Sequence, residues 1–371
     1  MDPHSGLFGR RSAAGAGCRS KRDAEPAAVE AVVSTARQSW LDVIYNKTSI
    51  TADLAPHLKS WSYTDNLSGQ ADDLQITVED RAQLWQGNWF PSRGDTLTAT
   101  IRRKNWNKDG EDSQLPLGRF EIDEIEVGGP PAEVKIKALS VPQSSPLKGQ
   151  NKHRAWEKTK LSVIARDIAA GVAMSLVYDV TDDPHYDRIE QTEETDLEFL
   201  HRICKEAGLA LKISDLQVVI FDAAKYEQAE PTLMIDKKQY TFLSYSGKST
   251  INEVYHSCTI KYKQPKSKTT LTYTFTPPNP PPTQRTLVLR EHVDSLAEAE
   301  RKAKKALREK NSASDTYGFT IAGALDVWAG MTVTLKNFGA FDGKWLVTQV
   351  SHSQSGGHKV AVQLRRCLEG Y

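Results

Sequence analysis

The sequence has little cysteine, with four in 371 residues. Cys18, Cys204, Cys258 and Cys367 are scattered along the chain, and no two of them form a Cys-x-x-Cys pair. Zinc-binding and thioredoxin-like sites commonly rely on such pairs, so neither kind of site is indicated. Sparse cysteine is typical of a protein that folds in a reducing compartment.

Long apolar runs and an excess of one charge are also missing. No run of about 18 apolar residues occurs, so the sequence predicts no membrane-spanning helix. The basic N-terminal stretch lacks the continuous apolar region of an ordinary secretion signal. The 48 Lys and Arg residues nearly balance the 47 Asp and Glu residues. Because dedicated nucleic-acid binders usually carry a basic excess, we expect no stable binding of nucleic acid.

Recognisable catalytic motifs are absent as well. The chain has no Gly-x-Ser-x-Gly elbow, no His-x-x-x-His or His-Glu-x-x-His pair, and no glycine-rich phosphate loop of standard spacing. We therefore expect no catalytic residue, no metal site and no cofactor. The chain is predicted not to be an enzyme.

Two pairs of side chains have residue types that occur in catalytic sites, although neither lies in a recognisable motif. His201 and Cys204 share one face of an expected helix, but a Cys–His couple needs an exposed thiolate. Cys204 adjoins a core position of that helix, so a buried and inert pair is expected. Glu193 and Glu194 would offer an acid and a base. Adjacent side chains diverge, however, and both residues precede the start of the helix.

Two clusters of like residues were considered next. Asp179, Asp182, Asp183 and Asp187 crowd one loop, without the spacing or the glycine of an EF-hand, so a solvated acidic loop is expected. The aromatic turn at 84–91 carries three large rings. Such a turn is expected to close the end of a barrel rather than to stack a ligand.

What the chain does contain is a repeat. Two stretches each offer three segments in which apolar and polar residues alternate, with glycines at corresponding joints. Alternation of this kind is typical of strands with one buried face. The segments are 94–98, 117–125 and 134–138 in the first stretch, and 330–334, 342–350 and 360–364 in the second.

Two explanations of the repeat stay open. Any two antiparallel meanders look alike at this level, whereas a duplicated β-barrel would also bear on function. Residues Phe120 and Ile122 are out of phase with Ile125 and Val127, which predicts a β-bulge near Asp123.

The fold class follows from these patterns. Between the two β regions, near Trp156, the apolar period changes from two residues to about 3.6, which indicates helices. We expect a mainly β protein with an α+β insert, in which two similar antiparallel β-barrel domains flank a small α/β module. The predicted parts are an N-terminal extension (1–37), a first barrel domain (38–152), an α/β module (153–228), and a second barrel domain (229–371) with one long helix (about 295–310).

Several motifs resemble those of one known family. They lie at 68–81, 85–95, 118–125, 155–161, 193–200, 295–303 and 364–371. On these motifs the sequence is similar to phage late-control protein D, a family of baseplate-hub proteins of tailed phages and of tail-like particles such as defective prophages and contractile bacteriocins. The similarity runs from about residue 38 to the C-terminus, and the first 36 residues depart from the family pattern.

The resemblance implies a structural role. Members of the family are expected to form a homotrimeric ring with two similar barrels in each subunit. Six similar units could match a six-fold tail tube on one side, while true three-fold symmetry matches a trimeric spike on the other. The implied partners are the tail tube protein, baseplate wedge proteins, the tape-measure protein and the central spike. The implied location is the distal tail end of a virion or tail-like particle, assembled in the cytoplasm of the bacterial host.

Two rival functions remain at this point. A tail-associated cell-wall (peptidoglycan) hydrolase would need a carboxylate pair or a Cys–His site in a cleft. A tail-assembly factor would be absent from the finished particle.

Overall fold

The computed structural model describes residues 36–106, 108–141, 145–214, 216–263, 270–291, 293 and 296–371. The chain divides into two compact units, 1–36 and 37–371, and the second contains all the elements given below. Nearly all of the expected extension at 1–37 lies outside the described residues, as does residue 295, where the expected long helix begins.

The first β region is a six-stranded antiparallel sheet rolled around one core. Its strands lie in the order β3-β4-β7-β6-β5-β1. All six contribute buried apolar side chains to a single cluster, because alternate residues of each strand face inward. The elements are β1 (Gln38–Tyr45), β2 (Thr48–Ser49), α1 (Thr51–Leu54), β3 (Leu58–Asn66), β4 (Asp73–Glu79), β5 (Thr96–Lys104), β6 (Asp112–Gly128) and β7 (Glu133–Leu139).

The second β region repeats this strand order. Its strands lie in the order β14-β18-β21-β20-β19-β13, so the first to sixth strands of each region occupy corresponding places. One difference is that β13 runs parallel to β19, whereas β1 runs antiparallel to β5. The elements are β13 (Leu233–Asp236), β14 (Phe242–Ser249), β18 (Asp315–Ala322), β19 (Thr332–Lys336), η2 (Gly339–Phe341), β20 (Gly343–Gln354) and β21 (His358–Arg366).

The correspondence extends to single backbone hydrogen bonds. In the first copy, the N–H of Gly94 donates to the carbonyl of Ile122 at 2.9 Å. In the second copy, the N–H of Gly330 donates to the carbonyl of Val347, also at 2.9 Å. Both glycines have positive φ, +89° and +94°, a conformation that glycine adopts without steric cost. The repeat therefore reflects one local structure built twice.

The predicted β-bulge near Asp123 is confirmed, and it occurs in both copies. The pairing of β6 with β7 shifts register between Ile122 and Glu124. The pairing of β20 with β21 shifts between Val347 and Gln349. Asp123 is thus the extra residue of the first copy, in the place that the residue after Val347 takes in the second.

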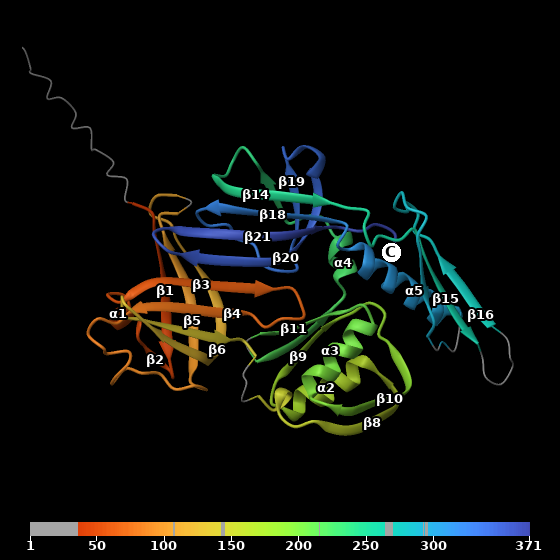
Figure 1. Ribbon diagram of the computed structural model, residues 1–371, viewed down its shortest axis with the longest axis horizontal. Helices are drawn as coiled ribbons and strands as arrows, with labels where there is room; N and C mark the ends of the chain where they lie inside the picture. The colour runs from red at the N-terminus through yellow and green to blue at the C-terminus, as the bar shows by residue number, and fades with distance from the viewer. Residues whose placement is uncertain are drawn as a thin grey trace, which may run out of the picture. The chain divides into compact units, whose positions relative to one another are not determined.

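A small α/β module lies between the two β regions in sequence. The mixed sheet β11-β12-β9 and the two-stranded antiparallel sheet β8–β10 enclose helices α2 and α3 around a separate core (Figure 1). The two-stranded sheet was not predicted. The elements are η1 (Pro146–Lys148), β8 (Lys152–Lys160), α2 (Leu161–Gly171), β9 (Ser175–Asp179), β10 (His185–Glu194), α3 (Asp196–Glu206), β11 (Ala210–Ser214), β12 (Gln217–Phe221) and α4 (Ala223–Gln228).

A second insert interrupts the second β region between β14 and β18. Three strands form a separate sheet in the order β16-β15-β17, and helix α5 packs on it around its own small core. The sequence predicted the helix at about 295–310, as part of the second barrel domain, but not that it packs on a separate sheet. The elements are β15 (Ser257–Lys263), β16 (Thr270–Phe275), β17 (Thr286–Leu289) and α5 (Leu296–Asn311).

The predicted fold class is confirmed. The chain is mainly β, with large antiparallel sheets, two similar barrel domains and a small α/β module. Among the described residues, helices that combine the length and the apolar character needed to span a bilayer do not occur.

Candidate assembly interface

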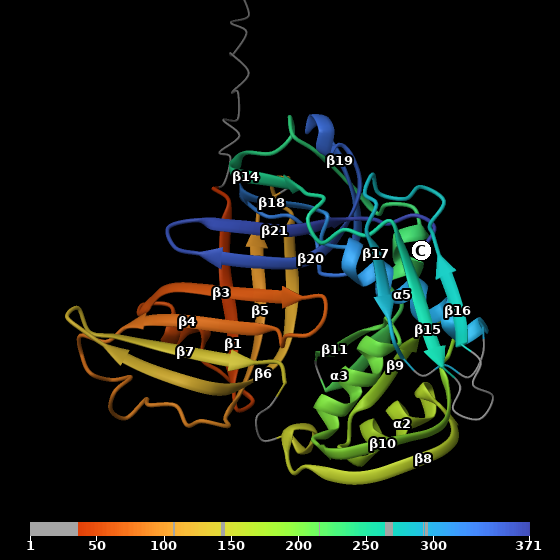
Figure 2. The ribbon, with the colours of Figure 1, turned by 45° about the vertical axis from the view of Figure 1, so that its right-hand side comes forward.

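The two β regions are joined by a direct strand pairing. The C-terminal half of β20 runs antiparallel to β3, from Gln349 opposite Asn66 to Gln354 opposite Trp61. Figure 2 shows the resulting succession of strands from β14 through β20 and β3 to β7 and β6. The β20–β3 pairing, here called the internal junction, makes one continuous sheet of the two copies of the repeat.

Side chains reinforce the internal junction. The amide of Gln349 donates to Asn66 Oδ1 at 2.8 Å, and the amide of Gln354 donates to the carbonyl of Ser39 at 3.0 Å. At the bulge, the Thr348 carbonyl accepts from a backbone N–H of the first β region at 3.0 Å. The bulge thus turns a carbonyl of the second β region toward the first β region of the same chain.

A pair of buried histidines lies beside the internal junction. His352 Nδ1 and His358 Nε2 are 3.3 Å apart, and His358 Nδ1 lies 2.9 Å from the hydroxyl of Ser39. Burial lowers the pKa of His352 to about 3, helped by His358 and Arg103. Burial, with Arg103, lowers the pKa of His358 to about 4. Both rings are therefore neutral near pH 7.

A buried ion cluster ties the α/β module to both β regions. Lys212 on β11 pairs with Asp65 on β3 and with Asp72, whose Oδ2 lies 3.0 Å from the ammonium. Asp65 also accepts a hydrogen bond from the backbone of Ala329 at 2.8 Å. Burial raises the pKa of Asp72 to about 6, although Lys212 opposes the shift. The carboxylates of this cluster thus hold three parts of the chain together.

A second buried carboxylate holds helix α5 of the second insert in place. Glu227 on α4 accepts from Arg308 on α5 and from Arg365 on β21, and its other oxygen accepts from the backbone of Leu368 at 2.9 Å. Its side chain is only 1% exposed. Three segments far apart in the sequence, α4, α5 and the C-terminal stretch 365–368, meet at this one carboxylate.

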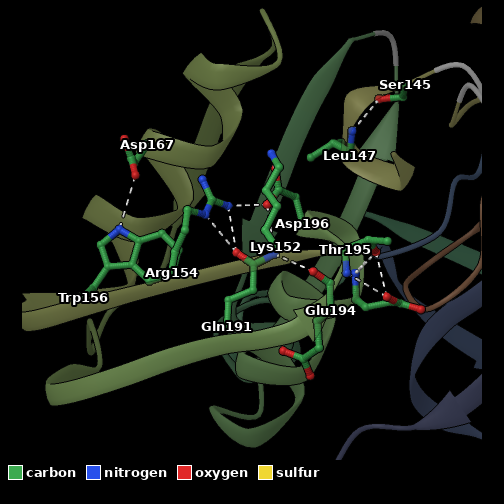
Figure 3. A network of polar contacts seen from close by, with 11 residues as sticks. Ser145, Leu147, Lys152, Arg154, Trp156, Asp167, Gln191, Glu194, Thr195 and Asp196 are labelled. Atoms are coloured by element: carbon green, nitrogen blue, oxygen red, sulfur yellow. Dashed lines mark hydrogen bonds and ion pairs between the residues drawn. The ribbon is translucent and has the colours of Figure 1, made fainter. Parts of the chain in front are cut away.

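A third network explains why the two-stranded sheet β8–β10 packs on α3. Asp196, at the start of α3, pairs with Lys152 and Arg154 of β8 and accepts from Gln191 of β10 at 3.0 Å (Figure 3). Thr195 and Glu198 also form a capping box at the start of α3. Each of these residues therefore has a structural task.

The comparisons with known proteins agree with this architecture. A family model described as "Phage tail baseplate hub (GPD)" matches residues 122–357, which is more than half of the chain. The chain belongs to this baseplate-hub family. The resemblance seen in the sequence is thereby confirmed.

One curated relative and two solved structures are similar to this chain. The probable baseplate hub protein of Escherichia phage P2 is 31% identical over 172 residues, which are 45% of this chain and 41% of that protein. The match thus spans less than half the length of this relative.

The two solved structures cover nearly all of the described part. The tail protein from Neisseria meningitidis MC58 has a TM-score of 0.67 and 14% identity, over 88% of this chain and 96% of that one. The 43 kDa tail protein of prophage MuSo2 from Shewanella oneidensis has a TM-score of 0.68 and 14% identity, over 89% and 98%. At this identity the likeness establishes a common fold.

The pair of His201 and Cys204 lacks the exposed thiolate that a nucleophile needs. Cys204 is 1% exposed, and burial raises the pKa of its thiol to about 12. Because the thiolate is the reactive form, such a thiol is inert near pH 7. His201, in contrast, is exposed, so the expectation that both residues are buried is wrong for the histidine.

Several of the acidic side chains considered in the sequence are paired with neighbours. Asp183 accepts hydrogen bonds from Ser162 and Tyr178, and Asp179 pairs with a lysine and a tyrosine of α4. Glu194 pairs with Arg202. In the described part of the chain, no group of three or more His, Cys, Asp or Glu residues is arranged to hold a metal ion.

The aromatic turn has two different faces. Trp85 is buried in the first core at 6% exposure, consistent with a barrel plug, whereas Trp89 and Phe90 are 41% and 49% exposed. All three line a hollow of about 350 Å³ that reaches the first core. Only one of the three rings therefore closes the barrel, because the other two lie at its rim.

Proposed function

We propose that this chain is the structural hub of a baseplate, at the distal end of the tail of a virion or tail-like particle. Three copies would form a closed ring in which each contributes two similar barrel domains. The ring would join the tail tube to a central spike and to the surrounding baseplate. Its role would be mechanical and geometric rather than enzymatic.

The observation that carries this proposal is the shared strand order of the two β regions. Rings join best when equivalent surfaces recur at equal angles. A chain that builds one motif twice supplies six similar surfaces in a trimer, with matching glycines and a matching bulge in each copy. Such a trimer would fit a six-fold tube on one face and a three-fold spike on the other.

The parts of the chain receive roles in this proposal. The barrel domains, proposed at 38–152 and 229–371, would form the ring, and the α/β module at 153–228 would brace it from outside. The tail tube, tape-measure, wedge and spike proteins are the proposed partners. Residues 1–37 are assigned an accessory role. The balanced charge supports a central passage that does not retain nucleic acid.

The hydrolase alternative would place its active site in a cleft lined by carboxylates. A cleft of about 500 Å³ is lined by Asp65, Asp72 and Asp179, and all three are engaged by lysines. Zymography on cell-wall material, with Asp72→Asn as the comparison, addresses it. Lysis by the wild type that is lost in the variant would replace the hub proposal with a hydrolase.

The hub proposal is tested by oligomeric state and by location. Light scattering of the purified chain should give three times the 41.3 kDa chain mass, and particle images should show a ring with six similar densities. Mass spectrometry of purified particles should find the chain, which separates a hub from an assembly factor. A stable monomer, together with particles lacking the chain, would refute the proposal.

A further inference from the structure

The first barrel has an apolar hollow at one end, which is called here the aromatic hollow. Its volume of about 350 Å³ lies within the range of pockets that bind ligands, about 300–1,000 Å³. The aromatic turn and α1 form its mouth, and its floor consists of buried apolar side chains from five strands. Because protein interiors are normally close-packed, an apolar hollow that reaches the core favours an occupant. The floor residues are Val43, Ile76, Leu97, Ile122 and Ile136.

The second barrel fills the corresponding position with an aromatic ring. In the first copy Ile136, on β7, faces Ile76 on β4. In the second copy Val362, on β21, faces Phe319 on β18. The two register shifts align Ile136 with Val362, so Ile76 and Phe319 occupy equivalent places. The ring of Phe319 packs edge-on against that of Phe242, with centroids 5.4 Å apart. The first barrel therefore lacks a ring that its duplicate contains, and this space is open to another molecule.

The aromatic turn holds the mouth of the hollow in a fixed shape. The two carboxylate oxygens of the buried Asp80 accept hydrogen bonds from the backbone N–H groups of Trp85 and Gln86, each at 2.9 Å. The ring of Trp89 contacts those of Trp85 and His57, with centroids 5.6 and 5.8 Å away. A ring held in this way has little conformational freedom to lose on binding. Trp89 can thus cover an inserted side chain without rearrangement of the turn.

The mouth of the hollow carries negative charge. Among the described residues that line the hollow, Asp53 is the one with a charge, and its side chain is exposed. Tyr45, which also lines the hollow, donates a hydrogen bond to Asp95. Burial opposes the ionisation of Asp95, but hydrogen bonds from Tyr45 and Asn46 outweigh it and lower the pKa of this carboxyl. A cation next to an inserted apolar group would therefore be attracted to the mouth.

We propose that the aromatic hollow binds a peptide segment of a partner protein in which a large apolar side chain stands next to a lysine or arginine. The apolar side chain enters the hollow, and the cation pairs with Asp53. Anchors that fill a pocket in this way supply much of the binding energy of protein interfaces. The choice of a polypeptide rests on the proposed hub function, because a hub is assembled through contacts with other proteins.

Capped peptides test this recognition directly. The probe is acetyl-Gly-Trp-Lys-Gly-amide, and two matched peptides replace its lysine by glutamate or its tryptophan by alanine. Saturation-transfer NMR with the full chain identifies the peptide protons that contact the protein, and a titration gives the dissociation constant. The indole protons of the probe should receive the strongest saturation. The glutamate peptide should bind more weakly than the probe, and the alanine peptide should not bind.

Variants of the chain place the binding in the hollow. Ile76→Phe gives the first barrel the aromatic residue of its duplicate and fills the hollow, so binding of the probe should be lost. Val288→Phe is the matched control, since Val288 is exposed on β17 of the separate sheet, and it should bind the probe like wild type. Asp53→Asn should weaken binding of the probe by about two- to fivefold, as expected for an exposed ion pair. It should also reduce the preference for the lysine peptide over the glutamate peptide.

The outcomes separate this site from the hub proposal. Failure of the probe to bind wild type, or equal binding by wild type and Ile76→Phe, would overturn the site. If circular dichroism shows that Ile76→Phe does not fold, an unchanged lysine preference in Asp53→Asn would overturn it instead. Free tryptamine that binds as tightly as the probe would replace the peptide by a small aromatic cation. All of these results leave the hub proposal standing, whereas a monomer that is missing from particles and still binds the probe would refute only the hub.

Discussion

The ammonium of Lys212 lies 3.0 Å from Asp72 Oδ2, although the lysine belongs to the α/β module and the aspartate precedes β4 of the first barrel. Asp65 completes the cluster from β3. The three side chains are 18%, 2% and 8% exposed. Charges this poorly hydrated must be paired, so the cluster fixes where the module attaches to the barrel.

Replacing Lys212 should therefore destabilise the fold strongly. Lys212→Met leaves two buried carboxylates without their cation, and breaking a buried pair in this way costs ~3–5 kcal/mol. Denaturant unfolding at pH 8 measures the loss. The matched control is Lys225→Met, because the Lys225–Asp179 pair has side chains 49% and 37% exposed and should be worth less than about 1 kcal/mol.

The pH dependence of the Lys212→Met variant distinguishes charge from packing. Burial already raises the pKa of Asp72, and removal of the lysine raises it further. A carboxyl with a raised folded-state pKa favours folding when protonated and opposes it as pH rises. The deficit relative to wild type should thus shrink between pH 8 and pH 5. A deficit that is equal at both pH values would assign the loss to packing.

The histidine pair predicts acid sensitivity of the internal junction. The folded-state pKa values of His352 and His358 lie below the ordinary value of 6.5, so these two residues bind protons in the unfolded chain at a pH where they stay neutral in the folded chain. Their effect on the free energy of unfolding is therefore absent above pH 6.5. As pH falls toward 4, the free energy of unfolding decreases by about 1.4 kcal/mol per pH unit for each histidine. Thermal or denaturant unfolding from pH 7 to pH 4.5 measures the slope.

A variant isolates the contribution of one ring. His352→Leu should flatten this slope by about half, because one site that binds a proton only when unfolded is gone. Val350→Ala serves as the control, since Val350 is fully buried on the same strand and does not titrate. It should lower the unfolding free energy by a similar amount at each pH. An unchanged slope in His352→Leu would show that other groups cause the acid sensitivity.

Glu227 predicts a different kind of local coupling. Glu227→Gln removes the charge that holds Arg308 and Arg365, leaving two partly buried guanidinium groups without a counterion. Hydrogen exchange should become faster in α5 and at the N–H of Leu368, because their shared anchor is weakened. Glu309→Gln is the control, since Glu309 is 58% exposed and lies 3.7 Å from its lysine partner. Equal protection in both variants would contradict the anchoring role.

The sequence revealed the local features of this fold. Alternation located the strands of both copies, and the phase change after Ile122 located the bulge, because each depends on neighbouring residues. The repeat also indicated that the strand order would recur, since similar sequences fold alike.

The contacts between distant segments could not be predicted in this way. Asp65 and Lys212 are 147 positions apart, and nothing in either neighbourhood identifies the other as its partner. The pairing of β8 with β10 escaped notice because strand β8 carries five charged residues among nine, and only Trp156 of that strand packs on the core.

The paired glycines allow a direct test that the two copies are one structure built twice. Gly94→Ala and Gly330→Ala each place a Cβ on a residue with φ near +90°, which costs roughly 1–2 kcal/mol. No atom lies within 4 Å of the added Cβ at Gly94, and the nearest at Gly330 is Leu67 Cδ1 at 3.4 Å. Backbone strain should therefore dominate at both sites, and the two losses in unfolding free energy should be similar.

Gly171→Ala is the control for these glycines, because it ends α2 with open space around the added Cβ and no positive φ. Alanine there should be neutral or stabilise by up to about 1 kcal/mol, since it restricts the unfolded chain and favours helix. If the two turns are equivalent, the unfolding free energies of Gly94→Ala and Gly330→Ala should lie below that of Gly171→Ala by the same amount. A loss at one glycine only would mean that the hydrogen bonds from Gly94 to Ile122 and from Gly330 to Val347 sit in turns of unequal strain, despite their identical 2.9 Å lengths.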